Sequence, residues 1–271
     1  MPELPEVETT LRGIAPYVTG ARIARLLVRE RRLRIPIPGG MEEQVRGQRI
    51  LELRRRGKYL LAALERGGLL IHLGMSGSLR VVAAGAAPAK HDHLDLVLDG
   101  GRCLRLRDPR RFGIFLWTPE PPEQHARLRH LGPEPLGEGL DGDYLHQRSR
   151  GRRTAVKPFL MDASVVVGVG NIYASEALFR AGILPSRSCH RVGRARYHLL
   201  AAAIKEVLSA AIERGGTSLR DFVQEDGSPG YFALSLQVYG RTGEPCAHCG
   251  EPIRQRRIGQ RSSFYCPRCQ H

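Results

Sequence analysis

Residues 246–269 read CAHCGEPIRQRRIGQRSSFYCPRC and decide the fold of the C-terminal end of the chain. A C-x-x-C motif stands at each end of this stretch, with sixteen residues between the two motifs. Each motif can supply two thiolates to one tetrahedral ion, which predicts one structural Zn²⁺ held by Cys246, Cys249, Cys266 and Cys269. Such a closed site leaves no position for a catalytic water, so we expect the metal to fold a hairpin and to do no chemistry.

Other readings of these cysteines are weaker. His248 could replace one thiolate, and C-x-x-C pairs also serve redox chemistry, but mainly in thioredoxin-like contexts. Six cysteines in 271 residues is not the density of a secreted disulfide scaffold. We interpret the remaining two, Cys103 and Cys189, as core or surface thiols.

The charge of the chain indicates a polyanionic partner. The formal net charge is +15, with 42 Lys and Arg against 27 Asp and Glu. A basic surface kept for solubility is the alternative, but the arginines are clustered, for example at 29–34, 54–58, 105–111 and 148–153. Arginine's planar fork suits phosphate, so nucleic acid is the first candidate.

Strand patterns dominate the chain from about residue 20 to 117. Residues 69–73 form a short apolar run, and residues 93–99 alternate with leucines on one face. Residues 103–107 alternate again, which predicts Leu104 and Leu106 inward and the arginines outward, as on a nucleic-acid-binding face. Several strands at this spacing predict a β-sandwich or barrel.

Helical patterns dominate the second half. Residues 119–142 are rich in Pro and Gly, and we place the connection between two domains in or just after them. Residues 171–180 and 192–214 are predicted helices, with glycines past their ends. We expect three parts, namely 1–130, 131–236 and 237–271. No apolar run could span a membrane and no signal peptide is present, so we expect a cytoplasmic protein without a membrane partner.

The first residues, MPELPEVETT, allow two interpretations, an ordinary helix start or a start with a further role. Apolar residues at helical spacing follow them, and proline and acids are common in a helix's first turn. An ordinary helix start, however, does not need Pro2 and Glu3. Residues 168–171, GVGN, open a second helix, whose N-terminus would favour phosphate. Plain core packing explains that motif equally well, and it lacks the context of a dinucleotide site.

Taken together, these motifs resemble one family along the whole chain. They are PELPEVE at 2–8, RGKY at 56–59, HLGMSG at 72–77, KHDH at 90–93, DPRRFG at 108–113, GVGNIYASE at 168–176, GSPGYF at 227–232 and the four-cysteine module. The chain is similar to the formamidopyrimidine-DNA glycosylases. The resemblance implies an α+β multidomain fold, with an N-terminal β-sandwich flanked by helices. A C-terminal helical domain would follow, with a helix–two-turn–helix motif and a four-cysteine zinc-finger hairpin.

The resemblance implies a DNA glycosylase and abasic-site lyase of base-excision repair. Its partner would be double-stranded DNA with an oxidised purine, such as 8-oxoguanine or a formamidopyrimidine, and we expect it to act as a monomer. The sister family that prefers oxidised pyrimidines is the alternative, but Leu4 favours the purine-directed branch. A non-catalytic DNA-binding zinc protein is the alternative from another class.

Four catalytic residues follow from the resemblance. With Met1 removed, Pro2 would carry a free secondary amine that attacks C1′ of the deoxyribose and forms a Schiff base. Glu3 would transfer protons as the sugar opens, and Lys58 would be the proton donor for β-elimination. Arg261 would act in δ-elimination, although a guanidinium suits phosphate binding better than proton donation. Lys58 as the nucleophile in place of Pro2 is the alternative mechanism.

The DNA-binding positions also follow from the resemblance. Met75, Arg110 and Phe112 would fill the gap left by the flipped base, although Met75 and Phe112 could instead be core residues. His91, Arg152 and Asn171 would contact phosphate, and Lys157 would line the damaged-base pocket. Residues 224–231 would form a lip over the flipped base.

Overall fold

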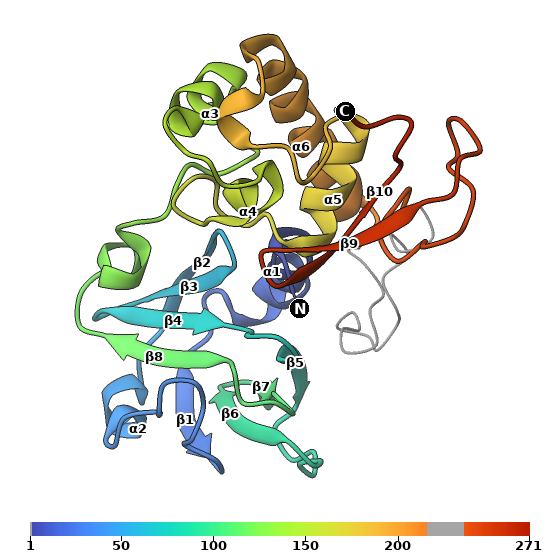
Figure 1. Ribbon diagram of the computed structural model, residues 1–271. Coiled ribbons are helices and arrows are strands. Elements are labelled where there is room, and N and C mark those ends of the chain that lie inside the picture. Colours follow the sequence, from blue (N-terminus) through green and yellow to red (C-terminus); the bar gives the residue numbers. More distant parts are fainter. Residues whose placement is uncertain (1, 216–235) are drawn as a thin grey trace. The chain divides into compact units, whose positions relative to one another are not determined.

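The computed structural model describes residues 2–215 and 236–271, which divide into two compact units (Figure 1). The first unit comprises the described residues up to Arg129 together with Arg214 and Gly215, and the second comprises His130–Glu213 and the described residues from 236 onward. The first unit has a large hydrophobic core, and a smaller apolar cluster lies in the second unit around the C-terminal cysteines.

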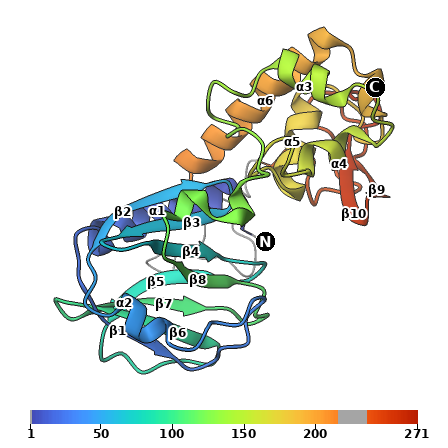
Figure 2. The same cartoon turned by 90° about the vertical axis from the view of Figure 1, so that its left-hand side faces the viewer.

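The first unit is a sandwich of two four-stranded antiparallel sheets (Figure 2). One sheet has the order β1-β6-β7-β5 and the other the order β2-β3-β4-β8. Two helices flank them, because α1 packs against β2 and β5 and α2 packs against β1 and β8. The elements are α1 Leu4–Val18, β1 Ile23–Val28, α2 Met41–Val45, β2 Ile50–Arg56, β3 Tyr59–Leu64, β4 Gly68–His72, β5 Ser78–Ala83, β6 Asp92–Leu98, β7 Arg102–Arg107, β8 Ile114–Thr118, η1 Pro122–Gln124 and η2 Ala126–Leu128.

The core between the sheets follows from the alternation of the strands. Leu94, Leu96 and Leu98 of β6 are all buried, and they pack in one cluster with alternate residues of β3, β4 and β7. Successive side chains of a strand point to opposite faces, so one apolar face per sheet is enough to build a sandwich. The predicted β-sandwich flanked by helices is therefore confirmed.

Strand β7 shows one sequence expectation to be wrong. Leu104 and Leu106 lie in the core as predicted, but the Arg105 side chain is only 5% exposed and does not face outward. Its Nε and Nη2 donate to the two carboxylate oxygens of Asp95, each at 2.8 Å. Asp95 lies directly opposite on β6, and a bidentate ion pair is what allows a guanidinium to be buried.

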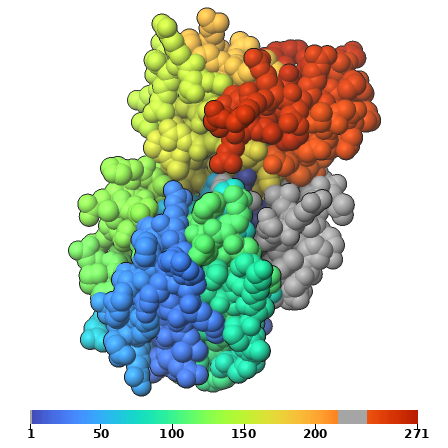
Figure 3. Space-filling view, turned by 60° about the horizontal axis from the view of Figure 1, so that its bottom comes forward, coloured from blue at the N-terminus to red at the C-terminus, as the bar shows by residue number. Residues whose placement is uncertain are grey.

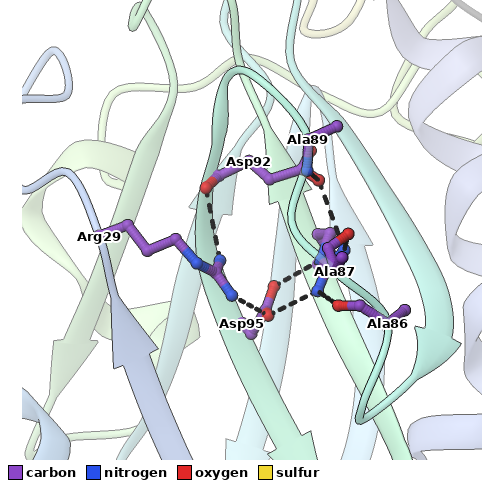
Figure 4. Close-up of polar contacts among 7 residues, drawn as sticks. Arg29, Ala86, Ala87, Ala89, Asp92 and Asp95 are labelled. Atoms are coloured by element: carbon purple, nitrogen blue, oxygen red, sulfur yellow. Dashed lines mark hydrogen bonds and ion pairs between the residues drawn. The ribbon is translucent and has the colours of Figure 1, made fainter.

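The same guanidinium anchors the loop between β5 and β6, whose residues Ala86, Ala87 and Ala89 are labelled in Figure 4. Its Nη2 and Nη1 donate to the carbonyl oxygens of Ala86, at 2.8 Å, and Ala87, at 3.1 Å. Asp92 Oδ2 accepts a hydrogen bond from the Ala89 backbone N–H at 2.8 Å. Buried charges therefore hold the loop that leads to His91.

Asp95 is ionised in this cluster. Burial alone would raise the pKa of Asp95, but hydrogen bonds from Arg105 and Arg29 outweigh burial and leave its pKa below the ordinary value. A carboxyl with a lowered folded-state pKa stabilises the fold fully above its unfolded-state pKa. That contribution is lost as the pH falls through the folded-state value.

The second unit is mainly helical. Its elements are α3 Gly142–Ser149, α4 Val156–Met161, α5 Asn171–Arg180, η3 Cys189–Arg191, α6 Arg194–Glu213, β9 Arg254–Ile258 and β10 Arg261–Tyr265. Helix α5 has the predicted bounds, and α6 lies within the predicted 192–214. Strands β9 and β10 pair as an antiparallel hairpin between the two C-x-x-C motifs. None of the helices in the described part of the chain has both the length and the apolar character that crossing a bilayer requires.

We predict that Asp95→Asn lowers the free energy of unfolding at pH 7 by about 3–5 kcal/mol, because it leaves Arg105 buried without its counter-charge. Urea unfolding between pH 2 and 7 measures this. The free energy of unfolding of the wild-type protein should lose the Asp95 contribution below about pH 4. In the variant, the free energy of unfolding should not show that part of the dependence on pH. Asp99→Asn is the control: Asp99 is exposed and accepts from the Arg22 backbone N–H, and a change within about 0.5 kcal/mol is expected. Equal stability of Asp95→Asn and wild type would contradict the prediction.

Candidate active site

The first residues are held by the start of α1. Pro2 and Glu3 precede the helix and both are buried, Glu3 with 2% exposed. The Glu6 carboxylate accepts from the Glu3 backbone N–H at 2.8 Å, and the two acids form a capping box. A capping box satisfies backbone N–H groups that a helix start leaves open. The nitrogen of Pro2 therefore has a defined position, one residue before the N-cap of a well-capped helix.

An ion pair joins this helix to the β2–β3 hairpin. Arg55 Nε donates to Glu8 Oε2 at 2.7 Å, and the two side chains are only 11% and 16% exposed. Burial alone would raise the pKa of Glu8, but hydrogen bonds from Arg55 and Arg12 leave it below the ordinary value. Lys58 lies three residues after Arg55, in the turn of that hairpin. The Glu8–Arg55 pair thus ties the helix that follows Pro2 to the turn that carries Lys58.

His72 lies opposite Tyr59, the residue after Lys58, and the sequence gives it no role. It ends β4, opposite Tyr59, and their rings are 4.8 Å apart. Burial, and then the positive charge of Lys58, lower the pKa of His72 to about 4, so the ring is neutral at pH 7. Its Nδ1 accepts from the Gly74 backbone N–H at 2.9 Å, which places the ring proton on Nε2. The charge of Lys58 therefore acts on a neutral N–H donor, and only the β3–β4 register, which sets Tyr59 opposite His72, could have predicted this pairing.

The three predicted gap-filling residues lie on two adjacent loops of the first unit. Met75 is half-buried, whereas Arg110 is exposed and the Phe112 side chain is 42% exposed. The Arg110 guanidinium lies 5.0 Å from the centre of the Phe112 ring. Phe112 is therefore not a core residue. His91 lies on a neighbouring loop, in a left-handed backbone conformation with φ of 74°.

The start of α5 carries the predicted phosphate contact of the second unit. Asn171 is the first residue of the helix, and its Nδ2 donates to the Tyr239 hydroxyl at 3.4 Å. Its Oδ1 is buried and has no hydrogen-bond partner within the described residues. A helix N-terminus favours an anion. Tyr239 is a further candidate that lies 68 residues away in sequence, too far for a motif to reveal.

Glu176 of α5 fixes the backbone around Tyr239. Its carboxylate accepts from the backbone N–H groups of Gln237 at 2.8 Å, Val238 at 3.0 Å and Tyr239 at 2.8 Å. Burial raises the pKa of Glu176, and these three hydrogen bonds oppose that shift. The carboxylate thus connects α5 to the segment that leads into the cysteine module.

Lys157 is fully buried in α4. Its Nζ donates to the Ser262 carbonyl oxygen at 3.0 Å and to the Ser263 hydroxyl at 2.9 Å. These residues directly follow Arg261, which is exposed at the start of β10. Lys157 therefore holds the strand that presents Arg261. Arg152, in the same unit, forms an ion pair with Asp162 at 3.4 Å.

The four cysteines form a metal site. Their sulfur atoms lie within 4.8 Å of one another, with Cys246 and Cys269 3.9 Å apart and Cys249 and Cys266 3.5 Å apart. Zn–S bonds of about 2.3 Å in a tetrahedron place the sulfurs about 3.8 Å apart, so the cluster fits Zn²⁺. All four are free thiols, and His248 is not part of the cluster. One structural zinc is therefore confirmed, and the hairpin it supports lies at the surface of its unit (the red residues in Figure 3).

The predicted site residues divide between the two units. The first unit holds Pro2, Glu3, Lys58, Met75, His91, Arg110 and Phe112. The second holds Arg152, Lys157, Asn171, Arg261 and the cysteines. The predicted lip at 224–231 lies outside the described residues.

Zinc binding can be tested by replacing single cysteines. Cys249→Ser should lower the zinc content well below one ion per chain and unfold the hairpin, because structural zinc supplies folding free energy. Elemental analysis of the purified protein measures the metal. Cys189→Ala is the control, since Cys189 is buried near α3 and should keep full occupancy. A full zinc content in Cys249→Ser would contradict the four-thiolate site.

Comparison with known proteins covers almost the whole chain. Three family models match: the formamidopyrimidine-DNA glycosylase N-terminal domain at residues 1–115, the H2TH domain of the same family at 131–223, and the zinc finger found in FPG and IleRS at 243–271. A formamidopyrimidine-DNA glycosylase of Methylococcus capsulatus is 60% identical, with 100% of both chains covered.

Two solved structures of the Lactococcus lactis enzyme are similar to this fold. Its complex with Fapy-dG-containing DNA has a TM-score of 0.91 at 32% identity and covers 99% of this chain and 100% of that one. Its complex with DNA containing an abasic site has a TM-score of 0.92 at 33% identity and covers 99% of each chain. The chain therefore belongs to the formamidopyrimidine-DNA glycosylase family.

Proposed function

We propose that this protein is a base-excision repair enzyme that removes oxidised purines from double-stranded DNA and then cleaves the strand. The observation that carries the proposal is the position of Pro2, buried with Glu3 at a capped helix start in a chain of this family. Two similar structures hold DNA with a Fapy-dG lesion or an abasic site, which supports a purine lesion as substrate and an abasic site as intermediate.

The reaction needs the nitrogen of Pro2 as a free secondary amine, so Met1 must be absent. The nitrogen attacks C1′ of the deoxyribose, the N–C1′ bond forms, and the bond from C1′ to the base breaks. The ring oxygen then leaves C1′ with a proton, and an iminium ion remains. A secondary amine cannot lose a further proton from this nitrogen, so the cation persists and acts as an electron sink.

Elimination follows from that cation. The proton on C2′ becomes acidic, its loss expels the 3′-phosphate, and a second elimination expels the 5′-phosphate. Glu3 is the group next to Pro2 that can carry protons during ring opening. Lys58 supplies a proton for the first elimination, and Arg261 binds and neutralises phosphate during the second, as an arginine clamp does.

Cations and neutral hydrogen-bond donors of both units are proposed to bind DNA. Lys58 with His72, and Asn171 at the start of α5, are proposed to bind phosphates next to the lesion. His91 and Arg152 are proposed to contact the backbone further along. Flipping the base costs a few kcal/mol, and Met75, Arg110 and Phe112 are proposed to fill the space it leaves. Lys157 is proposed to act through the hairpin strand that presents Arg261.

The nucleophile can be located by borohydride trapping on a duplex with 8-oxoguanine opposite cytosine. We expect a covalent protein–DNA adduct, and mass spectrometry of its digest should place the DNA on the peptide that begins with Pro2. Lys58→Met should still form the adduct but cleave the strand at least about 10-fold more slowly, since general acid catalysis contributes 10²–10⁴-fold. An adduct on the Lys58 peptide would favour the alternative nucleophile, and no adduct with wild-type protein would refute the mechanism.

Lesion choice separates this protein from the pyrimidine-directed sister family. Duplexes with 8-oxoguanine opposite cytosine and with thymine glycol opposite adenine are compared by single-turnover excision. The purine lesion should be removed at least about 10-fold faster, because a site built to hydrogen-bond one base leaves polar groups unpaired on another. Exclusive cleavage at thymine glycol would overturn the proposed substrate.

A further inference from the structure

One buried carboxylate links the two loops that carry Met75, Arg110 and Phe112. Asp108 is fully buried between β7 and β8. Its Oδ1 accepts from the Ser76 hydroxyl at 3.0 Å, and its Oδ2 accepts from the Gly113 backbone N–H at 2.7 Å. Ser76 directly follows Met75, and Gly113 directly follows Phe112. A single side chain thus holds both loops at the positions next to the gap-filling residues.

The Ser76 hydroxyl extends the link to the third residue. It accepts from the Arg110 backbone N–H at 3.3 Å while it donates to Asp108. A hydroxyl has one donor and two acceptor positions, so both roles are compatible. Each of the three gap-filling residues therefore stands at, or next to, a hydrogen-bonding partner in one network.

The backbone of Asp108 also holds two residues in left-handed conformations. Its N–H donates to the His91 carbonyl oxygen at 3.0 Å, and its carbonyl accepts from the Arg111 N–H at 3.1 Å. His91 has φ of 74° and Arg111 has φ of 57°. Side-chain-bearing residues rarely adopt this region unless their surroundings hold them there. The Asp108 carbonyl further bonds with the His93 ring Nε2 at 2.8 Å.

The two loops touch backbone to backbone. Gly74 has φ of +65°, and a Cβ atom there would lie 2.4 Å from the Phe112 carbonyl carbon. A Cβ on Gly113 would lie 3.0 Å from Asp108 Oδ2 and 3.1 Å from the His72 carbonyl oxygen. At Gly74 and Gly113 the two loops are too close together for a larger residue. The Asp108 carboxylate bonds to both loops and therefore sets how they fit together.

We propose that Asp108, with Ser76, is a positioning residue for insertion into DNA. It has no exposed surface and does not touch DNA itself. It holds Met75, Arg110 and Phe112 in one arrangement before the lesion is bound, which reduces the ordering that insertion requires. This inference rests on the proposed function, since it assumes that the three residues replace a flipped base.

The test compares two substrates in single-turnover assays. One is a duplex with 8-oxoguanine opposite cytosine, whose base must be unstacked, and the other is a duplex with a preformed abasic site. Asp108→Ala should slow excision of 8-oxoguanine by roughly 100-fold, the size expected when an approximately 1 Å misplacement affects the reacting geometry. Cleavage at the abasic site, where no base has to be expelled, should fall less than about 5-fold.

Two further variants test the proposal if Asp108→Ala folds poorly. Ser76→Ala removes one hydrogen-bonding partner of Asp108. It should slow excision of 8-oxoguanine by about 10-fold and again affect cleavage at the abasic site less. Asp108→Asn should largely retain excision of 8-oxoguanine. The side-chain carbonyl of the asparagine can accept from the Gly113 N–H, and its amide can donate to the Ser76 hydroxyl. Asp99→Asn is the control, an exposed carboxylate of the same unit that lies outside this network and should leave both rates unchanged.

The outcomes separate the inference from the proposed function. Wild-type protein that excised no 8-oxoguanine would refute the function, and the positioning role with it. Wild-type activity together with an equal loss on both substrates in Asp108→Ala and Ser76→Ala would refute the positioning role alone. Full excision by Asp108→Ala would also refute it. A fluorescent 2-aminopurine opposite the lesion gives a second readout, since Asp108→Ala should lose the signal change caused by insertion while wild type keeps it.

Discussion

Burial of carboxylates inside a strongly basic chain is the constraint on which the rest of this structure depends. Among the described residues, the buried acids are Glu3, Glu6, Asp92, Asp95, Asp108 and Glu176, whereas the buried arginines and lysines are only Arg105 and Lys157. A buried charge is tolerated only when hydrogen bonds or an opposite charge compensate for lost hydration. These six acids therefore act as internal acceptors, and most of the abundant arginines remain at the surface, where a polyanion can reach them.

Four of these acids each organise a different segment that carries candidate site residues. Glu6 caps the helix that follows Pro2, and Asp95 anchors the loop before His91 through Arg105. Asp108 links two loops, and Glu176 holds the segment at Tyr239. Loops rarely hold a catalytic geometry alone, and these carboxylates supply backbone contacts that regular strands would otherwise provide.

Much of the fold could be predicted from the sequence because its signals are local. Helix α5 begins after Gly170 and ends before Gly182, and two C-x-x-C motifs specify the metal without any knowledge of the rest. Arg105 shows where local patterns fail, since its burial depends on Asp95 across the sheet.

The candidate site could be predicted only in part, for the same reason. Sequence motifs indicate Lys58, Asn171 and Arg261. The contacts of His72 depend on strand register, and those of Tyr239 depend on how distant parts of the chain fold together. The family resemblance indicates Lys157, but the hydrogen bonds from Lys157 to Ser262 and Ser263 join residues more than a hundred positions apart. Partners at such separations leave no period or spacing in the sequence that could be recognised.

The burial of Lys157 has a consequence for what zinc binding stabilises in the second unit. Its ammonium exchanges water for Ser262 and Ser263 only when β10 has docked on α4. Strand β10 in turn needs the hairpin that the four thiolates close around the metal. Desolvating a lysine is unfavourable, so the free energy of zinc binding helps to drive that step. Metal capture by the last residues of the chain is thereby coupled to the completion of a helical core whose sequence lies about a hundred residues earlier.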